Sequence, residues 1–150
     1  MKYHILFRAC DKVESVHRVA RPYGLNKTEV IKVSFFSLYC AIKAENFSFT
    51  IIGDGLSNEL LDFFKNFDDV VVDNAELGSA SESLQKQINL SLQIPDDDWV
   101  YMCEDDYLHT SFAFRYLSEF IENSKQYIKT SGKKKNYINR FIGDLSNVPL

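Results

Sequence analysis

Three consecutive carboxylates, Glu104, Asp105 and Asp106, are the residues of this sequence best suited to chemistry. They follow an apolar run, Trp99–Cys103, that predicts a strand covered on both faces. If extended backbone continues through the acids, Glu104 and Asp106 share one face and Asp105 points to the other. Hard cations such as Mg²⁺ and Mn²⁺ bind one or two carboxylates together with phosphate oxygens. The pattern therefore predicts a metal-diphosphate site at a strand end; the alternative is a solvated acidic loop.

Further charged residues fall at the ends of two other predicted strands. Tyr3–Cys10 has the apolar content of a first strand, with Arg8 and Asp11 at or just after its end. Phe47–Ile52 indicates a second strand, and the Asp54 that follows it has a glycine on each side. Those glycines permit a tight turn with the backbone close to a ligand, although the same tripeptide is also ordinary turn chemistry.

Helical patterns separate the predicted strands. The expected order is strand Tyr3–Cys10, helix 28–44, strand Phe47–Ile52, helix 57–66, strand Val70–Val72, helix from Ser79, strand Trp99–Cys103 and helix 111–123. In the third helix, a capping box from Ser79 to Glu82 precedes an apolar stripe of Leu84, Ile88 and Leu92. We expect this stripe to face the core.

The first and last helices also carry apolar stripes. Asn26 with Glu29 three residues later is a plausible cap for the first helix. Its expected core residues are Ile31, Phe35, Leu38 and Ile42, and those of the last helix are Phe112, Tyr116, Leu117, Phe120 and Ile121. In the third helix, Lys86 lies within the first turns, where backbone N–H groups can receive an anion.

The alternation of strands and helices predicts an α/β fold of three layers, a mostly parallel sheet with helices on both faces. Strand ends of such a sheet lie along one edge, so Cys10-Asp11, Gly53-Asp54-Gly55 and Glu104-Asp105-Asp106 are expected to meet at one crevice. Neither a Gly-x-Gly-x-x-Gly fingerprint nor a Walker lysine loop is present, which disfavours dinucleotide oxidoreductases and P-loop enzymes. The 150 residues suit a single domain, residues 1–150.

Composition narrows the class further. The net charge of −4 argues against nucleic acid as a partner, and no apolar run is long enough to span a membrane. The amino terminus turns polar too early for a signal peptide, so a cytoplasmic location is expected. Three cysteines in apolar surroundings predict buried free thiols. Basic residues gather after Ser124 (Lys125, Lys129, Lys133, Lys134, Lys135 and Arg140), either as a solvated segment or as a clamp for a phosphate-bearing ligand.

In this order the motifs resemble the amino-terminal, nucleotide-sugar-binding half of GT-A-fold glycosyltransferases, particularly the inverting family-two group. The segment Ile51-Ile52-Gly53-Asp54-Gly55-Leu56-Ser57 stands where that family has an Asp-Asp-Gly-Ser-like turn. Gly78-Ser79-Ala80-Ser81 stands at its glycine-rich loop, and Glu104-Asp105-Asp106 at its Asp-x-Asp signature. The resemblance covers roughly residues 3–121.

The resemblance implies a role for each matched residue. Asp54 would contact the base or ribose of a UDP- or GDP-sugar. Asp106 would bind Mn²⁺ or Mg²⁺, and Glu104 would reach metal or ribose. Arg8, Asp11, Lys86 and Asp105 are the further candidates for nucleotide-sugar binding. The metal would act as a Lewis acid on the leaving diphosphate.

The sequence departs from the family in three ways. Glu104 replaces the first Asp of the signature, and Leu84-Gln85-Lys86-Gln87 replaces an arginine motif, so that Lys86 is the candidate for that contact. The family also continues for about 100 residues beyond the signature to build the acceptor site and supply a general base. Either the acceptor half is reduced, a partner chain or oligomer supplies it, or the sequence is a fragment.

Three functions therefore remain open. The first is a metal-dependent glycosyltransferase, or its donor domain, with an unknown acceptor. The second is a non-catalytic nucleotide- and metal-binding module with a regulatory or partner-dependent role. The third is a doubly wound receiver-like or phosphotransfer domain whose acidic strand ends bind Mg²⁺ alone.

Overall fold

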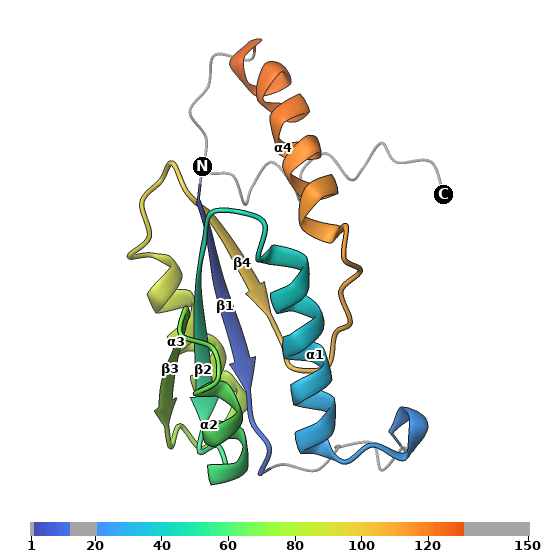
Figure 1. The fold of residues 1–150 in the computed structure, drawn as a ribbon. Helices are drawn as coiled ribbons and strands as arrows, with labels where there is room; N and C mark the ends of the chain where they lie inside the picture. Colours follow the sequence, from blue (N-terminus) through green and yellow to red (C-terminus); the bar gives the residue numbers. More distant parts are fainter. Residues whose placement is uncertain (1, 13–20, 131–150) are drawn as a thin grey trace, which may run out of the picture. The chain divides into compact units, whose positions relative to one another are not determined.

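A computed structural model describes residues 2–12 and 21–130 of the chain, and its centre is a four-stranded sheet (Figure 1). The strands are β1 (Tyr3–Ala9), β2 (Phe47–Asp54), β3 (Val70–Ala75) and β4 (Trp99–Cys103). They pair in the order β3-β2-β1-β4, and every pairing is parallel. The predicted parallel sheet is confirmed, and its carboxyl ends lie along one edge as expected.

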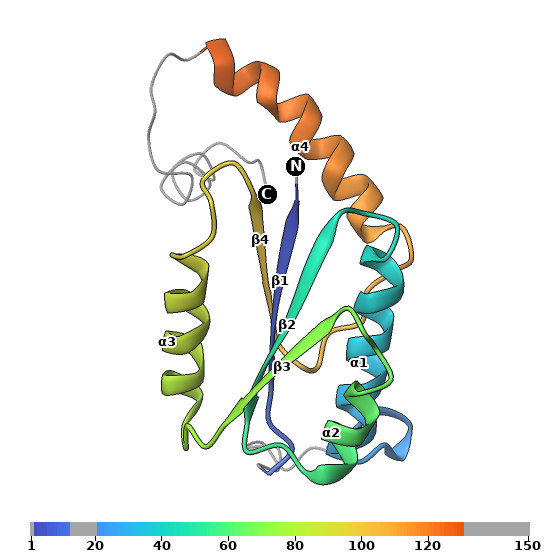
Figure 2. The same cartoon turned by 60° about the vertical axis from the view of Figure 1, so that its left-hand side comes forward.

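Helices fill the three connections between the strands, and a further helix follows β4. They are α1 (Lys27–Ile42), α2 (Asn58–Phe64), α3 (Ala80–Ser91) and α4 (Ala113–Thr130), with a short 3-10 turn, η1 (Pro22–Gly24), before α1. Helices α1 and α2 lie against one face of the sheet and α3 against the other (Figure 2). The chain is thus a small α/β fold.

The main core lies under α1 and α2 and is strongly aromatic. Phe35 of α1 is fully buried, and its ring contacts Phe7 of β1, Phe49 of β2 and Phe64 of α2 at centroid distances of 6.2, 5.2 and 5.0 Å. Such ring pairs add to the free energy gained from burial. The four predicted core residues of the first helix, Ile31, Phe35, Leu38 and Ile42, are all 0% exposed.

The Asn26 cap is present as a full capping box, and the structure shows the Ser79 half of the capping box predicted from Ser79 to Glu82. The Asn26 side chain accepts a hydrogen bond from the Glu29 N–H at 2.9 Å, and the Glu29 carboxylate accepts one from the Asn26 N–H at 2.7 Å. At the start of α3, Ser79 Oγ accepts a hydrogen bond from the Glu82 N–H at 3.2 Å. These contacts satisfy N–H groups that the helix itself leaves unpaired.

The predicted core faces of α3 and α4 are corrected by the structure. In α3 the buried side chains are Ser83 and Gln87. The expected stripe, Leu84, Ile88 and Leu92, is 43%, 37% and 78% exposed. Of the core residues expected for the last helix, Ile121 is buried and Leu117 is half-buried, whereas Tyr116, Phe120 and Phe112, which precedes α4, are each more than half exposed. The last helix also starts two residues later and β3 ends three residues later than predicted.

The chain divides into two compact units, Met1–Phe114 and Arg115–Leu150, with the boundary inside α4. The sheet and all three predicted strand-end motifs belong to the first unit. The prediction of a single domain over residues 1–150 stays a prediction. No helix among the described residues is long and apolar enough to cross a membrane. Residues 13–20 and the basic residues Lys133, Lys134, Lys135 and Arg140 lie outside the described residues.

Candidate functional site

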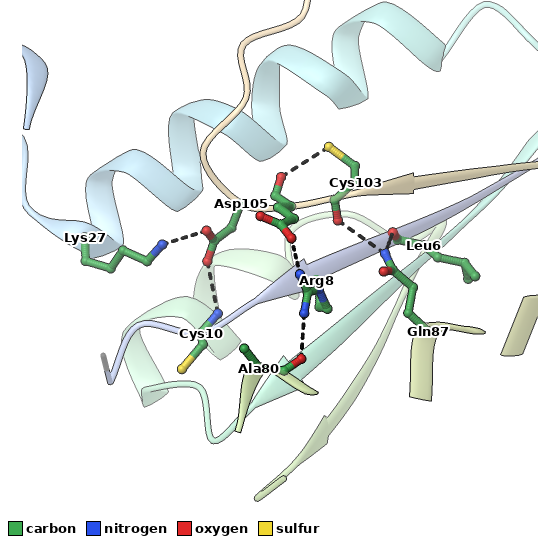
Figure 3. Close-up of polar contacts among 9 residues, drawn as sticks. Leu6, Arg8, Cys10, Lys27, Ala80, Gln87, Cys103 and Asp105 are labelled. Atoms are coloured by element: carbon green, nitrogen blue, oxygen red, sulfur yellow. Dashed lines mark hydrogen bonds and ion pairs between the residues drawn. The ribbon is translucent and has the colours of Figure 1, made fainter. Parts of the chain in front are cut away.

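The carboxyl ends of β1 and β4 form the point at which the winding of the sheet reverses. The connection from β1 to β2 carries α1 on one face, whereas the connection from β3 to β4 carries α3 on the other. Ligands of open α/β sheets bind outside the strand ends at such a reversal. Figure 3 shows the polar side chains and backbone groups that meet there. We call this place, formed by Arg8 and Cys10 at the end of β1 and by Glu104 and Asp105 after β4, the switch-point crevice.

Asp105 joins three elements at the switch-point crevice. Its carboxylate accepts a hydrogen bond from the Cys10 N–H at 3.1 Å and an ion-paired hydrogen bond from Lys27 Nζ at 2.6 Å. Asp105 is only 8% exposed. Asp105 therefore links the end of β4 to the end of β1 and to the first residue of α1. Its negative charge is balanced by Lys27 within the protein.

Arg8 and Glu104 form an ion pair across the same crevice. The Arg8 Nη2 group donates to Glu104 Oε1, and Nη1 donates to the Ala80 carbonyl at 2.8 Å, at the start of α3 (Figure 3). The Arg8 side chain is 13% exposed and that of Glu104 is 53% exposed. The cation that an acidic strand end was predicted to need is therefore supplied by the chain itself.

Asp54 and Asp11 hold the loops beside the crevice. One carboxylate oxygen of Asp54, Oδ1, accepts hydrogen bonds from the N–H groups of Leu77 and Gly78 at 2.7 and 3.0 Å. Asp11 accepts a hydrogen bond from the N–H of Ser57, the residue that precedes α2, at 3.1 Å. Both acids thus fix the backbone of a strand-end loop.

An open hollow of about 240 Å³ lies between these loops, lined by Cys10, Lys12, Asp54, Glu76 and Gly78. Its walls come from the carboxyl ends of β1, β2 and β3, so it adjoins the switch-point crevice along the same edge of the sheet. Lys12 Nζ and Glu76 pair within it at 3.3 Å. Two of the three predicted strand-end motifs are therefore brought together at this hollow.

The geometry expected of the acidic triplet is wrong in one respect. Strand β4 ends at Cys103, and Asp105 and Asp106 form a turn, so the extended alternation does not continue. Asp105 folds under the strand end, whereas Asp106 is exposed and makes no hydrogen bond with any described residue. Three adjacent carboxylates avoid mutual repulsion because two of them have cationic partners and the third faces water.

Lys86 is not part of the crevice. Its Nζ pairs with Asp73 Oδ1 of β3 at 2.7 Å, and both β2 and β1 lie between β3 and β4 in the sheet. The expected arginine-like contact of Lys86 with a nucleotide stays a prediction, and in this structure the ammonium group is paired with Asp73.

Two residues that hold the crevice together, Lys27 and Gln87, belong to none of the motifs predicted from the sequence. Lys27 is the first residue of α1, where a cation lies against the positive end of the helix dipole. Because a lysine is unfavourable at this end of a helix, its presence in the sequence indicates that an acidic residue lies nearby to pair with it. Gln87 is 3% exposed and donates to the Leu6 carbonyl at 2.7 Å and to the Cys103 carbonyl at 3.4 Å. It bridges β1 and β4 just below the crevice, and its helical position gave no such signal.

Two nearby groups have shifted pKa values. Burial raises the pKa of the Cys103 thiol to about 12, and the negative charge of Asp106 adds to this shift. Burial lowers the pKa of His109, whose Nε2 lies 2.8 Å from the hydroxyl of Tyr101. The thiol therefore stays protonated at neutral pH, whereas the imidazole is neutral, with Nε2 hydrogen-bonded and Nδ1 buried without a partner in the described part of the chain.

The donor set fits a divalent cation only in part. Glu104 and Asp106 offer exposed carboxylate oxygens, the ligand type that Mg²⁺ and Mn²⁺ prefer. Within the described ranges, no group of three or more His, Cys, Asp and Glu side chains is placed to hold an ion. These cations commonly bind through one or two carboxylates plus phosphate oxygens. The residues therefore fit a cation shared with a phosphate ligand rather than a cage made by the protein.

A comparison of the chain with models of known protein families found no match. Searches of curated proteins and of solved structures found none either.

Proposed function

We propose that the sheet is the donor-binding part of a GT-A-like glycosyltransferase that binds a nucleoside-diphosphate sugar with Mn²⁺ or Mg²⁺. One observation carries the proposal: the ends of β1 and β4 meet at the reversal of the sheet and bring Arg8, Glu104 and Asp105 together there. Beside them lies an open hollow with Asp54 in its wall. Carboxylates, cations and a hollow at this edge suit a charged nucleotide ligand.

In this proposal each part of the ligand has a place along the edge. The nucleoside occupies the hollow beside Asp54, and the diphosphate extends toward the end of β4. Asp106 would hold the cation there, and a bound cation would supply Lewis-acid stabilisation of the leaving diphosphate. A partner chain or oligomer would complete the acceptor site.

A second candidate is a nucleotide-binding module that transfers no sugar. One observation favours it: Asp11, Asp54, Glu104 and Asp105 each accept hydrogen bonds from groups within the described chain. An acid held in this way orients loops and charges more readily than it removes a proton from an acceptor. Binding would then be the whole activity of the chain.

Calorimetric titration with UDP and with GDP, each with and without Mn²⁺, tests the proposal. We expect binding that needs Mn²⁺ and prefers one base. Asp106→Asn should weaken metal-dependent binding by roughly tenfold or more, since it removes an exposed ligand and no packing. Asp97→Asn, a change at an exposed acid before β4, is the matched control and should leave affinity unchanged.

Two results would count against the proposal. Equal metal-dependent affinity in folded Asp106→Asn would remove Asp106 from the site. If neither nucleotide binds the folded native protein while Mg²⁺ alone does, the receiver-like class becomes the better interpretation. Hydrolysis of a UDP- or GDP-sugar by the native protein would separate the glycosyltransferase from the binding module.

A further inference from the structure

The ion pair of Arg8 and Glu104 closes the switch-point crevice in an unusual way. The two residues are neighbours across β1 and β4, one position beyond the paired residues Phe7 and Cys103. The cation is largely buried, whereas the acid is about half exposed. A ligand arriving from solvent therefore meets the carboxylate first, and the guanidinium lies behind it.

Arg8 has more hydrogen-bonding capacity than it uses. Nη2 donates to Glu104 and Nη1 to the Ala80 carbonyl, but Nε is buried and has no hydrogen-bond partner in the described part of the chain. A guanidinium presents five donors in a planar fork that suits phosphate oxygens. Arg8 also lies at the start of α3, where the helix dipole favours an anion. An anion would thus find an incompletely satisfied cation at this point.

Glu104 cannot serve a divalent cation fully while Arg8 neutralises it. The Arg8 guanidinium and a divalent metal ion are alternative partners of the Glu104 carboxylate, because both are attracted to its negative charge. We propose that Arg8 is an exchangeable partner, which holds Glu104 in the empty site and binds the diphosphate of the ligand once Glu104 is neutralised by another cation. This inference rests on the proposed function only for the identity of the anion.

The exchange makes two opposite predictions for the two members of the pair. Loss of the Glu104 charge should release Arg8, so that a diphosphate binds more tightly without any metal. If Glu104 served only as a metal ligand, the same change would leave metal-free binding unaltered. Loss of Arg8 should release Glu104, so that Mn²⁺ alone binds more tightly, and should at the same time weaken diphosphate binding. Such coupling is reciprocal and typically about fivefold or larger.

The first test is calorimetry with inorganic pyrophosphate in the absence of metal. Glu104→Gln should bind pyrophosphate at least about fivefold more tightly than the native protein. Glu59→Gln is the matched control: it removes the same charge from another pair of a partly buried cation with an exposed acid, Lys32 with Glu59 at 2.6 Å. A general effect of net charge would raise the affinity of both variants equally, and that result would overturn the proposal.

The second test is titration with Mn²⁺ alone, in which electron paramagnetic resonance measures the concentration of the free ion. Arg8→Gln should bind Mn²⁺ more tightly than the native protein and bind pyrophosphate less tightly. Arg8→Lys keeps a cation beside Glu104 if the glutamine variant is too unstable, and should show a smaller gain for Mn²⁺. No gain in either variant, with circular dichroism showing a folded protein, would contradict the exchange.

The outcomes separate this inference from the proposed function. Tighter pyrophosphate binding by Glu104→Gln in a protein that binds neither UDP nor GDP would support the exchange and reject the nucleotide. Metal-dependent UDP binding by the native protein without the gain in Glu104→Gln would retain the proposed function and reject the exchange.

Discussion

The three acids after β4 occupy three different environments although they are adjacent in sequence. Asp105 is buried with two donors, Glu104 is half exposed with one cation, and Asp106 faces solvent. A buried carboxylate is stable only when its charge is paired and hydrogen-bonded, which is what Lys27 and the Cys10 N–H provide. The residue available to an incoming cation is accordingly Asp106, and the residue that shapes the crevice is Asp105.

At the same scale, Cys103 gives a prediction about reactivity. Since its pKa is raised to about 12 by burial, only about one thiol in ten thousand is ionised at pH 8. We expect iodoacetamide to label Cys103 at least a hundredfold more slowly than the half-exposed Cys40, with the rate rising as the pH is raised toward 12. Mass spectrometry of digested samples, with Cys40→Ser to confirm the assignment, measures both rates. Similar rates at pH 8 would show that the end of β4 is open to solvent.

Helix α3 shows how an element can reverse the usual relation between apolar residues and burial. The face of the sheet under α3 carries Arg8, Asp73 and backbone carbonyls that accept hydrogen bonds from Gln87. Ser83 and Gln87 turn inward, and Gln87 supplies a donor to two of these carbonyls. The apolar stripe is left on the outside. The polar demands of the sheet therefore outweigh the hydrophobic pattern of the helix at this position.

Substitutions at two adjacent residues of α3, Gln87 and Ile88, should differ in how much they lower the free energy of unfolding. Gln87→Leu should lower the free energy of unfolding by about 1–3 kcal/mol, because it removes the donor from the buried Leu6 and Cys103 carbonyls. Ile88→Gln, at a side chain that is 37% exposed, should change it by less than about 0.5 kcal/mol. Urea denaturation of both variants gives the comparison. A larger loss in Ile88→Gln would mean that something covers the apolar stripe in solution.

The same helix marks the limit of what the sequence could predict. Local sequence pattern predicts the strands and the Asn26 cap, and the parallel topology predicts that the three acidic strand ends lie on one edge of the sheet. The structure confirms these predictions. The inward face of α3 does not follow, since an apolar period cannot reveal that Gln87 donates to carbonyls of two distant strands. The pairs of Arg8 with Glu104 and Lys27 with Asp105 depend on which strand lies beside β1. That neighbour is set by the whole fold.

At the scale of the molecule, the candidate site exists only when the sheet is complete. The Arg8–Glu104 pair joins residues 96 positions apart, and the Lys27–Asp105 pair joins residues 78 positions apart. Parallel pairing of this kind closes long loops before any contact compensates for the lost chain entropy. No single βα unit can form the crevice, so its integrity reports on the folding of the first unit as a whole.

The aromatic core gives the prediction for this scale. Phe35→Ala should lower the free energy of unfolding by about 3–5 kcal/mol, because the fully buried ring joins α1 to the sheet and to α2. Stability of a domain this size is about 5–15 kcal/mol, so the variant is expected to populate unfolded chains measurably. Labelling of Cys103 should then accelerate together with unfolding, since the thiol is protected only in the complete sheet.

Phe36 supplies the matched control on the same helix. Its ring is 54% exposed and lines an open apolar hollow of about 380 Å³ with Val33 and Phe63. Phe36→Ala should therefore cost less than about 1 kcal/mol and leave Cys103 protected. Urea denaturation and thiol labelling of Phe35→Ala and Phe36→Ala compare the free energy of unfolding and the protection of Cys103 in the two variants. If Phe35→Ala unfolded no more readily than Phe36→Ala, the aromatic core would not be what holds α1 and α2 on the sheet. If it unfolded while Cys103 stayed protected, the β1–β4 edge would be stable without that core.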